Sequence, residues 1–204
     1  MIVILDYGLG NVMAFQNAYQ RLNIPVRVAS TWEDLKGATK LVLPGVGAFD
    51  HAMTLFNRSG LREATEQLVL EEKVPVIGIC VGMQMLAQGS DEGELPGLAW
   101  VPGWVRRLNT DVLNQREQLP HMGWNDVSPT RDSTLFKDFE PDPRFYFLHS
   151  YFFGTAESNH QLAITHYGMR FSCVVNKENI FGVQFHPEKS HGNGLRLLRN
   201  FAEL

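Results

Sequence analysis

The stretch that decides the fold of this chain is VPVIGICVGMQM, residues 74–85. Its first half is a run of β-branched residues bounded by proline and glycine, which predicts a buried strand. Residues 83–88 favour a helix, and Cys80 lies at the junction of the two. Gly78 and Gly82 flank the cysteine at the spacing of a nucleophile elbow, a strained strand-turn-helix in which glycines relieve crowding. We therefore expect the sulfur at the carboxyl end of a sheet, beside the amino end of a helix.

A cysteine in that position suits nucleophilic catalysis. The helix dipole and the free N–H groups of the first turn favour a thiolate, and they could also stabilise an oxyanion during acyl transfer. Cys80 could equally be a small apolar residue of the core. The motif alone favours neither interpretation, so the rest of the chain has to decide.

Composition excludes several classes of protein. The chain has 204 residues, 44% of them hydrophobic and 20% charged, and no Pro/Gly/Ser-rich linker or charge run divides it. We expect one globular domain, residues 1–204. The net charge of −4 argues against nucleic-acid binding. No apolar run approaches the length of a membrane span, and the first residues lack the basic leader of a signal peptide, so a cytoplasmic location with no membrane partner is expected.

The cysteines and histidines do not predict a metal site. Two cysteines, Cys80 and Cys173, are too few for a disulfide framework, and no pair of histidines or cysteines has metal-ligand spacing. The loop DYGLGN, residues 6–11, lacks the third glycine of a dinucleotide-binding motif and is more consistent with a tight turn. We expect no metal and no cofactor.

Alternating strands and helices occupy the first half of the chain. Strands are predicted at residues 2–5, 26–29 and 40–43, with helices at 12–22, 48–57 and 61–72 and a capped helical turn at 31–35. This order predicts a parallel sheet with helices on both faces. Later residues predict antiparallel strands added to the sheet, at 100–108, 145–148, 161–165, 171–175 and 180–185, before a final helix at 195–202. The fold class is therefore α/β, mostly parallel, with antiparallel additions.

Three loops should meet at one edge of that sheet. They begin at Asp6, at Pro44, where the third strand is expected to end, and at Cys80. Ligands of open α/β sheets bind beyond the carboxyl ends of the strands. The glycines of PGVG, residues 44–47, could turn backbone N–H groups toward an anionic oxygen, although a plain loop is the more ordinary explanation when nothing else supports the first.

A histidine and a glutamate near the end of the chain complete a candidate set of catalytic groups. They lie in VQFHPEKS, residues 183–190, where the proline disfavours a helical His186. In an extended segment, His186 and Glu188 share a face, and a carboxylate next to a histidine orients the ring and stabilises its cation. Cys80, His186 and Glu188 are thus available as nucleophile, base and orienting group. A surface or core histidine is the alternative, and only the joint pattern argues against it.

Six motifs in order resemble the class I, or triad, glutamine amidotransferases. They are DYGLGN (6–11), PGVGAF (44–49), GICVGMQ (78–84), PHMGWN (120–125), FYFLHSY (145–151) and QFHPE (184–188). The resemblance implies a flavodoxin-like architecture and a glutaminase that hydrolyses L-glutamine through a glutamyl thioester. It is closest to the glutaminase subunits of histidine biosynthesis, which pass ammonia to a separate (β/α)8-barrel cyclase subunit in a heterodimer.

The resemblance also implies roles for individual residues. Cys80 would attack the glutamine amide, His186 would transfer protons and Glu188 would orient His186. Backbone N–H groups of Val81 and of Val46 or Gly47 would form the oxyanion hole, with the Val46 peptide reorienting on activation. The glutamine-binding positions that match are Gly47, Gln84, Ser150 and Tyr151.

Five positions match residues that face the partner subunit in the family. They are Asn11, Met122, Trp124, Tyr146 and Lys189. Met122 and Trp124 are expected in a glycine-containing loop, and methionine and aromatic residues are enriched at interfaces. A local core is the alternative for these two residues.

Other stretches leave the ammonia acceptor open. FSC (171–173), NIFG (179–182) and SHGNG (190–194) are similar to a branch of the family that supplies ammonia to an ATP-using amidotransferase acting on sugars of surface polysaccharides. A subunit that only binds its partner, and a stand-alone hydrolase of γ-glutamyl peptides, are further alternatives. The complete Cys80, His186 and Glu188 set argues against the first of these two.

Overall fold

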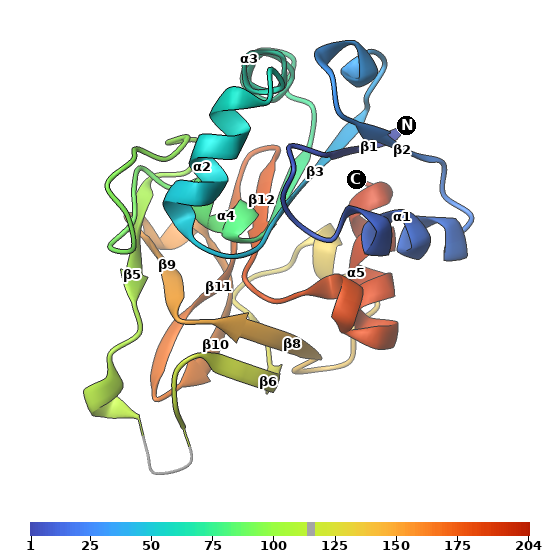
Figure 1. Ribbon diagram of the computed structural model, residues 1–204. Helices are drawn as coiled ribbons and strands as arrows, with labels where there is room; N and C mark the ends of the chain where they lie inside the picture. The colour runs from blue at the N-terminus through green and yellow to red at the C-terminus, as the bar shows by residue number, and fades with distance from the viewer. Residues whose placement is uncertain (114–116) are drawn as a thin grey trace.

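A ten-stranded sheet runs through the molecule, and its first half is entirely parallel (Figure 1). The computed structural model describes residues 1–113 and 117–204. The parallel strands stand in the order β2-β1-β3-β4-β12. Their bounds are β1 Ile2–Leu5, β2 Val26–Ala29, β3 Lys40–Gly45, β4 Val76–Cys80 and β12 Ile180–Val183. This is the flavodoxin-like strand order, with the Cys80 strand near the middle.

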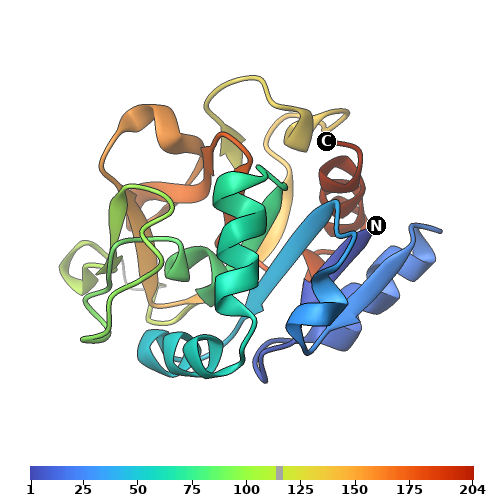
Figure 2. The same ribbon diagram turned by 90° about the horizontal axis from the view of Figure 1, so that it is seen from above.

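Helices cover both faces of the parallel strands, as the alternation of elements predicts. Figure 2 shows α1 (Val12–Arg21) and α5 (His191–Ala202) on one side and α2 (Phe49–Arg58) and α3 (Arg62–Glu66) on the other. The short helix α4 (Val81–Met85) contacts α2 and follows directly from β4. All residues of β1 and β4 are buried, because a central strand covered on both faces is apolar on both sides. The α/β fold class is confirmed.

The second half of the sheet is antiparallel. Strands β11 (Met169–Lys177), β10 (Gln161–Tyr167) and β7 (Ser128–Pro129) continue it beyond β12, and β9 (Tyr151–Thr155) with β5 (Gly103–Arg107) branches from β11. A separate two-stranded sheet pairs β6 (His121–Asp126) with β8 (Arg144–His149). Short 3-10 turns lie at Trp32–Leu35, Thr110–Val112, Thr134–Phe136, Ser158–His160 and Pro187–Lys189. In the described residues, no helix is long and apolar enough to cross a membrane.

The boundaries of several elements differ from expectation. The third strand does not end at Pro44 but continues to Gly45, which pairs with Cys80. Strand β1 pairs with β3 only as far as Val42, so Pro44 lies where one flank of the strand is open and its missing N–H is tolerated. Helix α4 begins at Val81 rather than at residue 83, and the helix expected at 61–72 contains a π-helical turn, Gln67–Glu71.

The expectation of a loop around Met122 and Trp124 is wrong, because both residues belong to strand β6. Along this strand, His121 is buried while Met122 and Trp124 are exposed. The polarity is the reverse of an ordinary half-buried strand, with a histidine inside and apolar side chains outside. The alternation of apolar and polar residues therefore does not predict this strand.

Replacing Gly82 with alanine should destabilise the fold strongly. A Cβ at Gly82 would lie 2.0 Å from the carbonyl oxygen of Leu43, so helix α4 would have to move away from β3. We expect the free energy of unfolding, measured with urea, to fall by about 3 kcal/mol. The control is Gly192→Ala in the first turn of α5, where a Cβ meets nothing within 4 Å and alanine should be neutral or stabilise by about 0.5–1 kcal/mol. Equal stability of the two variants would contradict the close approach.

Candidate active site

Cys80 lies on a strained turn between β4 and α4. Its backbone has φ 55° and ψ −111°, a conformation that is rare for a residue with a side chain. The two flanking glycines permit the turn, since a Cβ at Gly78 would lie 2.5 Å from the carbonyl oxygen of Gly82. Gly45 of β3 is equally close, its Cβ position being 2.5 Å from the Gly82 nitrogen. The structure thus forms the elbow that the spacing predicts, with the sulfur at the carboxyl end of the sheet.

His186 and Glu188 follow the end of β12 and form a buried pair. The His186 Nδ1 atom lies 2.8 Å from Glu188 Oε1, and each side chain is only 3% exposed. Because Glu188 occupies Nδ1, Nε2 is the ring nitrogen that remains available to Cys80, which lines the same cavity as His186. The fold thus brings a carboxylate, an imidazole and a thiol to one site.

The surroundings of His186 favour its cation. Burial by itself lowers the pKa of the ring, but the hydrogen bonds to Cys80 and Glu188 and the negative charges of those groups outweigh it and raise the pKa to about 9. The imidazole therefore retains a proton throughout the neutral pH range. This is the charge state needed beside a cysteine thiolate.

A cavity of about 360 Å³ opens over the Cys80 sulfur. All the residues expected to bind glutamine or an oxyanion line it, together with two members of the catalytic set: Val46, Gly47, Cys80, Val81, Gln84, Ser150, Tyr151 and His186. Glu188 lies behind His186. The cavity thus brings together residues that are more than 100 positions apart in the chain.

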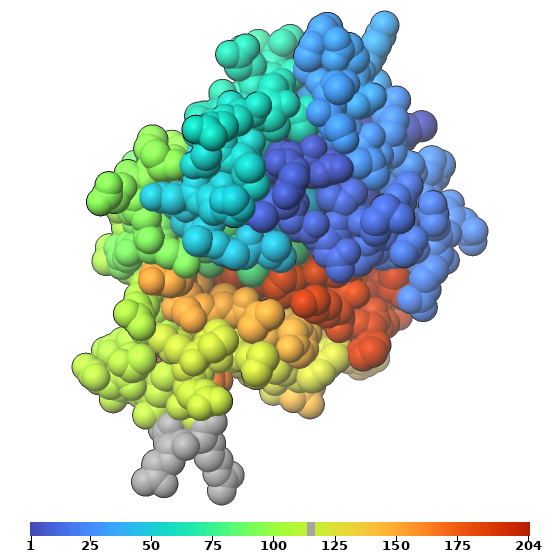
Figure 3. Space-filling view, in the orientation of Figure 1, coloured from blue at the N-terminus to red at the C-terminus, as the bar shows by residue number. Residues whose placement is uncertain are grey.

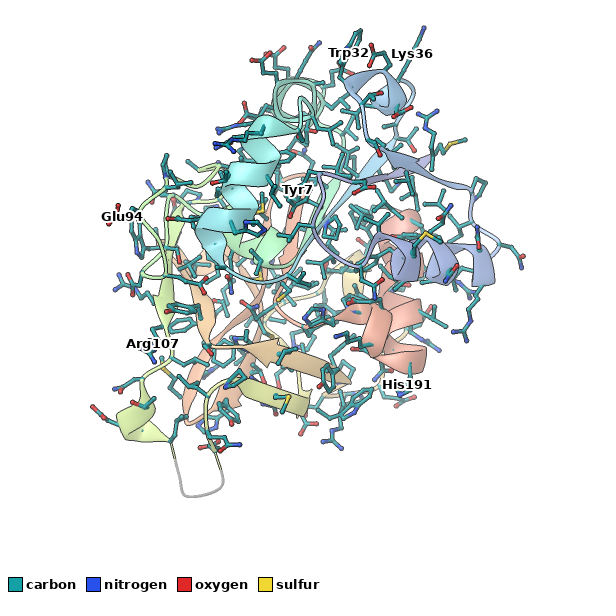
Figure 4. All side chains as sticks on the ribbon, viewed as in Figure 1. Tyr7, Trp32, Lys36, Glu94, Arg107 and His191 are labelled. Carbon is teal, nitrogen blue, oxygen red and sulfur yellow. The ribbon has the colours of Figure 1, made fainter. Side chains whose placement is uncertain are left out.

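The loop that follows Asp6 supports the cavity without lining it. Its Tyr7 hydroxyl donates a hydrogen bond of 2.6 Å to the Pro44 carbonyl oxygen, and the Tyr7 ring packs edge-on against Phe56 of α2. In Figure 4, Tyr7 lies next to the ribbon of α2. The loops at Asp6, Pro44 and Cys80 therefore meet as expected, with the first loop holding the second in place rather than lining the cavity.

Sequence patterns missed Glu92, which also lines the cavity. Its Oε2 atom accepts a hydrogen bond of 3.0 Å from the Phe49 backbone N–H at the start of α2. The adjacent turn is held by Asp50, whose carboxylate accepts hydrogen bonds from the backbone N–H groups of Glu94 and Leu95. Glu92 stands in the run DEGE with no periodicity around it, so the sequence carries no signal that separates it from an exposed charge.

The five candidate partner-facing residues are at the surface. Met122 is 62% exposed and Trp124 40% exposed, so the alternative of a local core is wrong for both. The Trp124 ring stacks on His191 at 5.3 Å and meets Tyr146 edge-on, and Lys189 lies over the Tyr146 ring. Lys189 also lines the cavity. These aromatic and basic side chains form one surface that adjoins the opening.

The same surface can be followed in the figures. Figure 4 labels His191 at the start of α5, close to the end of the β6–β8 sheet. Figure 3 shows the surface of β6 and β8, in yellow-green to orange, continuing into that of α5 in red. Asn11 is exposed at the amino end of α1, where its side chain accepts a hydrogen bond from the Ala14 N–H. Residues from the start, middle and end of the chain thus contribute exposed side chains near one another.

Within residues 1–113 and 117–204, no three histidine, cysteine, aspartate or glutamate side chains are grouped in a way that could hold a metal ion.

The doubly wound sheet and the cysteine elbow at its carboxyl edge define a class of enzymes, and the comparison of sequences agrees. The sequence model of the class I glutamine amidotransferase family matches residues 3–204, and the chain belongs to this family. It is 60% identical to the imidazole glycerol phosphate synthase subunit HisH of Bdellovibrio bacteriovorus, over the full length of both chains. It is 50% identical to the subunit of the same name in Leptospira interrogans, again over both full lengths.

Solved structures share the fold. A glutamine amidotransferase crystal structure superimposes with a TM-score of 0.76 at 22% identity, covering 99% of this chain and 97% of that one. A chain of PurLQS from Thermotoga maritima gives a TM-score of 0.72 at 17% identity, covering 99% of this chain and 97% of that one. The expected architecture is therefore that of known amidotransferases.

Proposed function

We propose that this chain is the glutaminase subunit of an imidazole glycerol phosphate synthase, with residues 1–204 acting as one amidotransferase domain in the cytoplasm. It hydrolyses L-glutamine to glutamate and passes the ammonia to a (β/α)8-barrel cyclase subunit. The observation that carries the proposal is the buried pair of Glu188 and His186, whose imidazole lines the same cavity as Cys80. The full-length identity to HisH subunits supports the choice of synthase.

The reaction starts from a thiolate–imidazolium pair, in which the Cys80 proton already resides on His186. The thiolate attacks the side-chain carbonyl carbon of glutamine to form a tetrahedral intermediate. The imidazolium then protonates the amide nitrogen, which leaves as ammonia, and the remaining product is a glutamyl thioester on Cys80. His186 next accepts a proton from water as the water attacks the thioester, and it returns that proton to the departing sulfur when glutamate is released. Glu188 keeps the ring oriented and stabilises its cation throughout.

Backbone N–H groups stabilise the negative oxygen of the intermediate in this proposal. Val81 supplies one from the first turn of α4, and Val46 or Gly47 supplies the other. The register supports this arrangement, because Gly45 pairs directly with Cys80 and places the following residues beside the sulfur. Val46 is 40% exposed and Gly47 has φ +84°, so the peptide between them is free to rotate on activation. The Tyr7 hydroxyl holds the preceding Pro44 carbonyl still.

Glu92 should bind the α-ammonium group of glutamine, and its charge is the feature to test. Glu92→Gln keeps an oxygen for the Phe49 N–H but removes the charge, and we expect KM for glutamine to rise about 10–100-fold while kcat changes little. Steady-state glutamate release measures both constants. The control is Glu94→Gln, which alters an exposed residue of the same loop that is labelled in Figure 4. An unchanged KM in Glu92→Gln would contradict this role.

The exposed surface formed by Met122, Trp124, Tyr146, Lys189 and Asn11 is where the cyclase subunit should dock. Ammonia released into water is protonated and loses its nucleophilicity, so a partner that covers the cavity has a chemical purpose. A surface with two aromatic residues, one methionine and a lysine at the opening is suited to such a contact.

The test of the proposed function is glutamate release by the purified chain, alone and with an imidazole glycerol phosphate cyclase subunit carrying its nucleotide ligand. We expect strong stimulation by the loaded partner. The Cys80→Ala chain with the same partner provides the background. If the partner does not stimulate glutamate release although Cys80 can still be alkylated, the proposed synthase is wrong. The sugar-amidotransferase branch then becomes the better explanation.

A further inference from the structure

We infer that Gln184 is a catalytic residue of this site, whose side-chain amide donates a hydrogen bond to the Cys80 sulfur and stabilises the thiolate. We further infer that the buried pair His121 and His149 is a positioning element that holds the Tyr151 carbonyl oxygen, the group against which this amide is oriented. The inference deepens the proposed glutaminase function and rests on Cys80 being its nucleophile. It concerns residues for which the sequence motifs suggest no role beyond packing.

The position of Gln184 is the first observation. It directly follows β12, and its backbone N–H donates a hydrogen bond of 2.8 Å to the Cys173 carbonyl oxygen. Its side chain is 0% exposed, and its Nε2 atom lies 3.8 Å from Cys80 Sγ. A fully buried amide must have its polar atoms satisfied, and here one of the partners is the reacting atom itself.

The surrounding contacts determine which end of the amide faces the sulfur. Gln84 Nε2 lies 3.1 Å from the Tyr151 carbonyl oxygen and 3.1 Å from Gln184 Oε1. A carbonyl oxygen only accepts, so the Gln84 atom facing it has to be the nitrogen. The Gln184 atom facing that nitrogen then has to be the oxygen, which leaves the Gln184 N–H groups directed at Cys80.

Two histidines extend the same chain on the far side of Tyr151. The Tyr151 carbonyl oxygen lies 2.8 Å from His149 Nδ1, and His149 Nε2 lies 3.0 Å from His121 Nδ1. By the same argument, His149 carries its proton on Nδ1 and accepts through Nε2, so His121 donates from Nδ1. The Asn125 side-chain amide, 3.3 Å from His121 Nε2, supplies the last donor. In this series of hydrogen bonds, each hydrogen atom therefore has only one possible position.

Both rings are neutral, as this arrangement requires. Burial, together with the neighbouring His121 and His186, lowers the pKa of His149 to about 3 despite the opposing hydrogen bond to the Tyr151 carbonyl oxygen. Burial also lowers the pKa of His121 to about 4, against the opposing charge of Glu117. The pair can therefore orient the Tyr151 carbonyl without adding a titrating charge near the nucleophile.

The Cys80 thiolate needs a hydrogen-bond donor because a neighbouring carbonyl oxygen destabilises its negative charge. The Leu148 carbonyl oxygen lies 3.9 Å from Cys80 Sγ, where it accepts from the thiol but repels a thiolate. With the Cys80 proton on His186, the Gln184 N–H remains as a neutral donor on the sulfur. A hydrogen bond to a charged atom is stronger than one between neutral groups, and this difference is large enough to alter the fraction of thiolate.

The test is the pH profile of Cys80 alkylation by iodoacetamide in the isolated chain. Gln184→Met removes the donor at similar volume, and we expect the pH of half-maximal rate to rise by about one to two units, with the limiting rate at high pH unchanged. Cys173 does not interfere, since it is 0% exposed and burial raises its pKa well above the usual range. The control is Gln161→Met, which removes a hydrogen bond to Ser172 outside the cavity. An unshifted profile in Gln184→Met overturns the inference.

The positioning pair is tested with two substitutions of His149. His149→Ala should move the same pH midpoint upward, whereas His149→Asn, which retains a donor near the Nδ1 position, should restore it. A purely structural role would change stability in both variants without this difference in the pH profile. If both variants keep the wild-type midpoint, the positioning role is excluded.

A measurement on the unaltered chain covers the case in which Gln184→Met does not fold. In ¹⁵N spectra, the side-chain amide of Gln184 should shift with pH at the same midpoint as the alkylation rate. The absence of any shift overturns the inference. None of these measurements uses glutamine, so glutamate release can fail, and with it the proposed function, without deciding the role of Gln184.

Discussion

Cys80→Ala is expected to lower glutamate release by about a thousandfold or more, because no other group of the cavity can form the thioester. The fold should survive, since alanine removes one sulfur atom from a side chain that is already 4% exposed. We expect the free energy of unfolding to change by no more than about 1 kcal/mol. The backbone strain at φ 55° is the same for both residues and does not offset this.

The matched control for this variant is Cys173→Ala, which alters the other buried cysteine, on β11 and outside the cavity. It should retain glutaminase activity. Residual activity above trace in Cys80→Ala, measured with the partner subunit present, would show that the nucleophile has been misassigned.

His186→Ala is expected to be nearly as damaging as Cys80→Ala, because the two side chains act as one unit. Without the imidazole, the thiol has no base and the leaving amide nitrogen has no acid. We expect a loss of about a thousandfold, and the double variant should be no worse than either single one. Glutamate release under saturating glutamine measures the loss.

The pH dependence of the same variant separates its two functions. In the unaltered chain, the raised pKa of His186, about 9, keeps a cation beside the sulfur below that pH. In His186→Ala that cation is absent, so alkylation of Cys80 at neutral pH should slow and the half-maximal rate should move to higher pH. His166→Ala, an exposed histidine on β10, should leave both readouts unchanged. Losses that add in the double variant would contradict a single catalytic unit.

The sequence predicts the parts of this protein that are built from short-range patterns. Alternating β and α segments give the parallel sheet, and the glycines around Cys80 give the elbow because only glycine allows the close approach to β3. The histidine and glutamate of QFHPE are two residues apart, and the sequence predicts that they share a face. The extended segment expected there is wrong, however, because the 3-10 turn Pro187–Lys189 is what brings Glu188 to His186 Nδ1. Six motifs in order were enough to indicate the family, to which the full-length match assigns the chain.

Other features depend on contacts between distant segments, and the sequence gives no local sign of them. The sequence predicts a loop where strand β6 lies, because the buried residue of this strand is a histidine and two of its exposed residues are apolar. Glu92 enters the cavity only because α2, more than 40 residues earlier, supplies the N–H that holds it.

The hydrogen-bond row that ends at the nucleophile is of the same kind. It joins Gln84 to Gln184 across 100 residues and His121 to His149 across 28. Periodicity reports which face of an element is buried, but a buried polar group is explained only by its partner. What the sequence determined by itself is the sheet, the elbow and the pairing of His186 with Glu188, since each follows from neighbours in the chain. Tertiary structure alone decided which polar side chains the fold buries around them and in which direction each one donates.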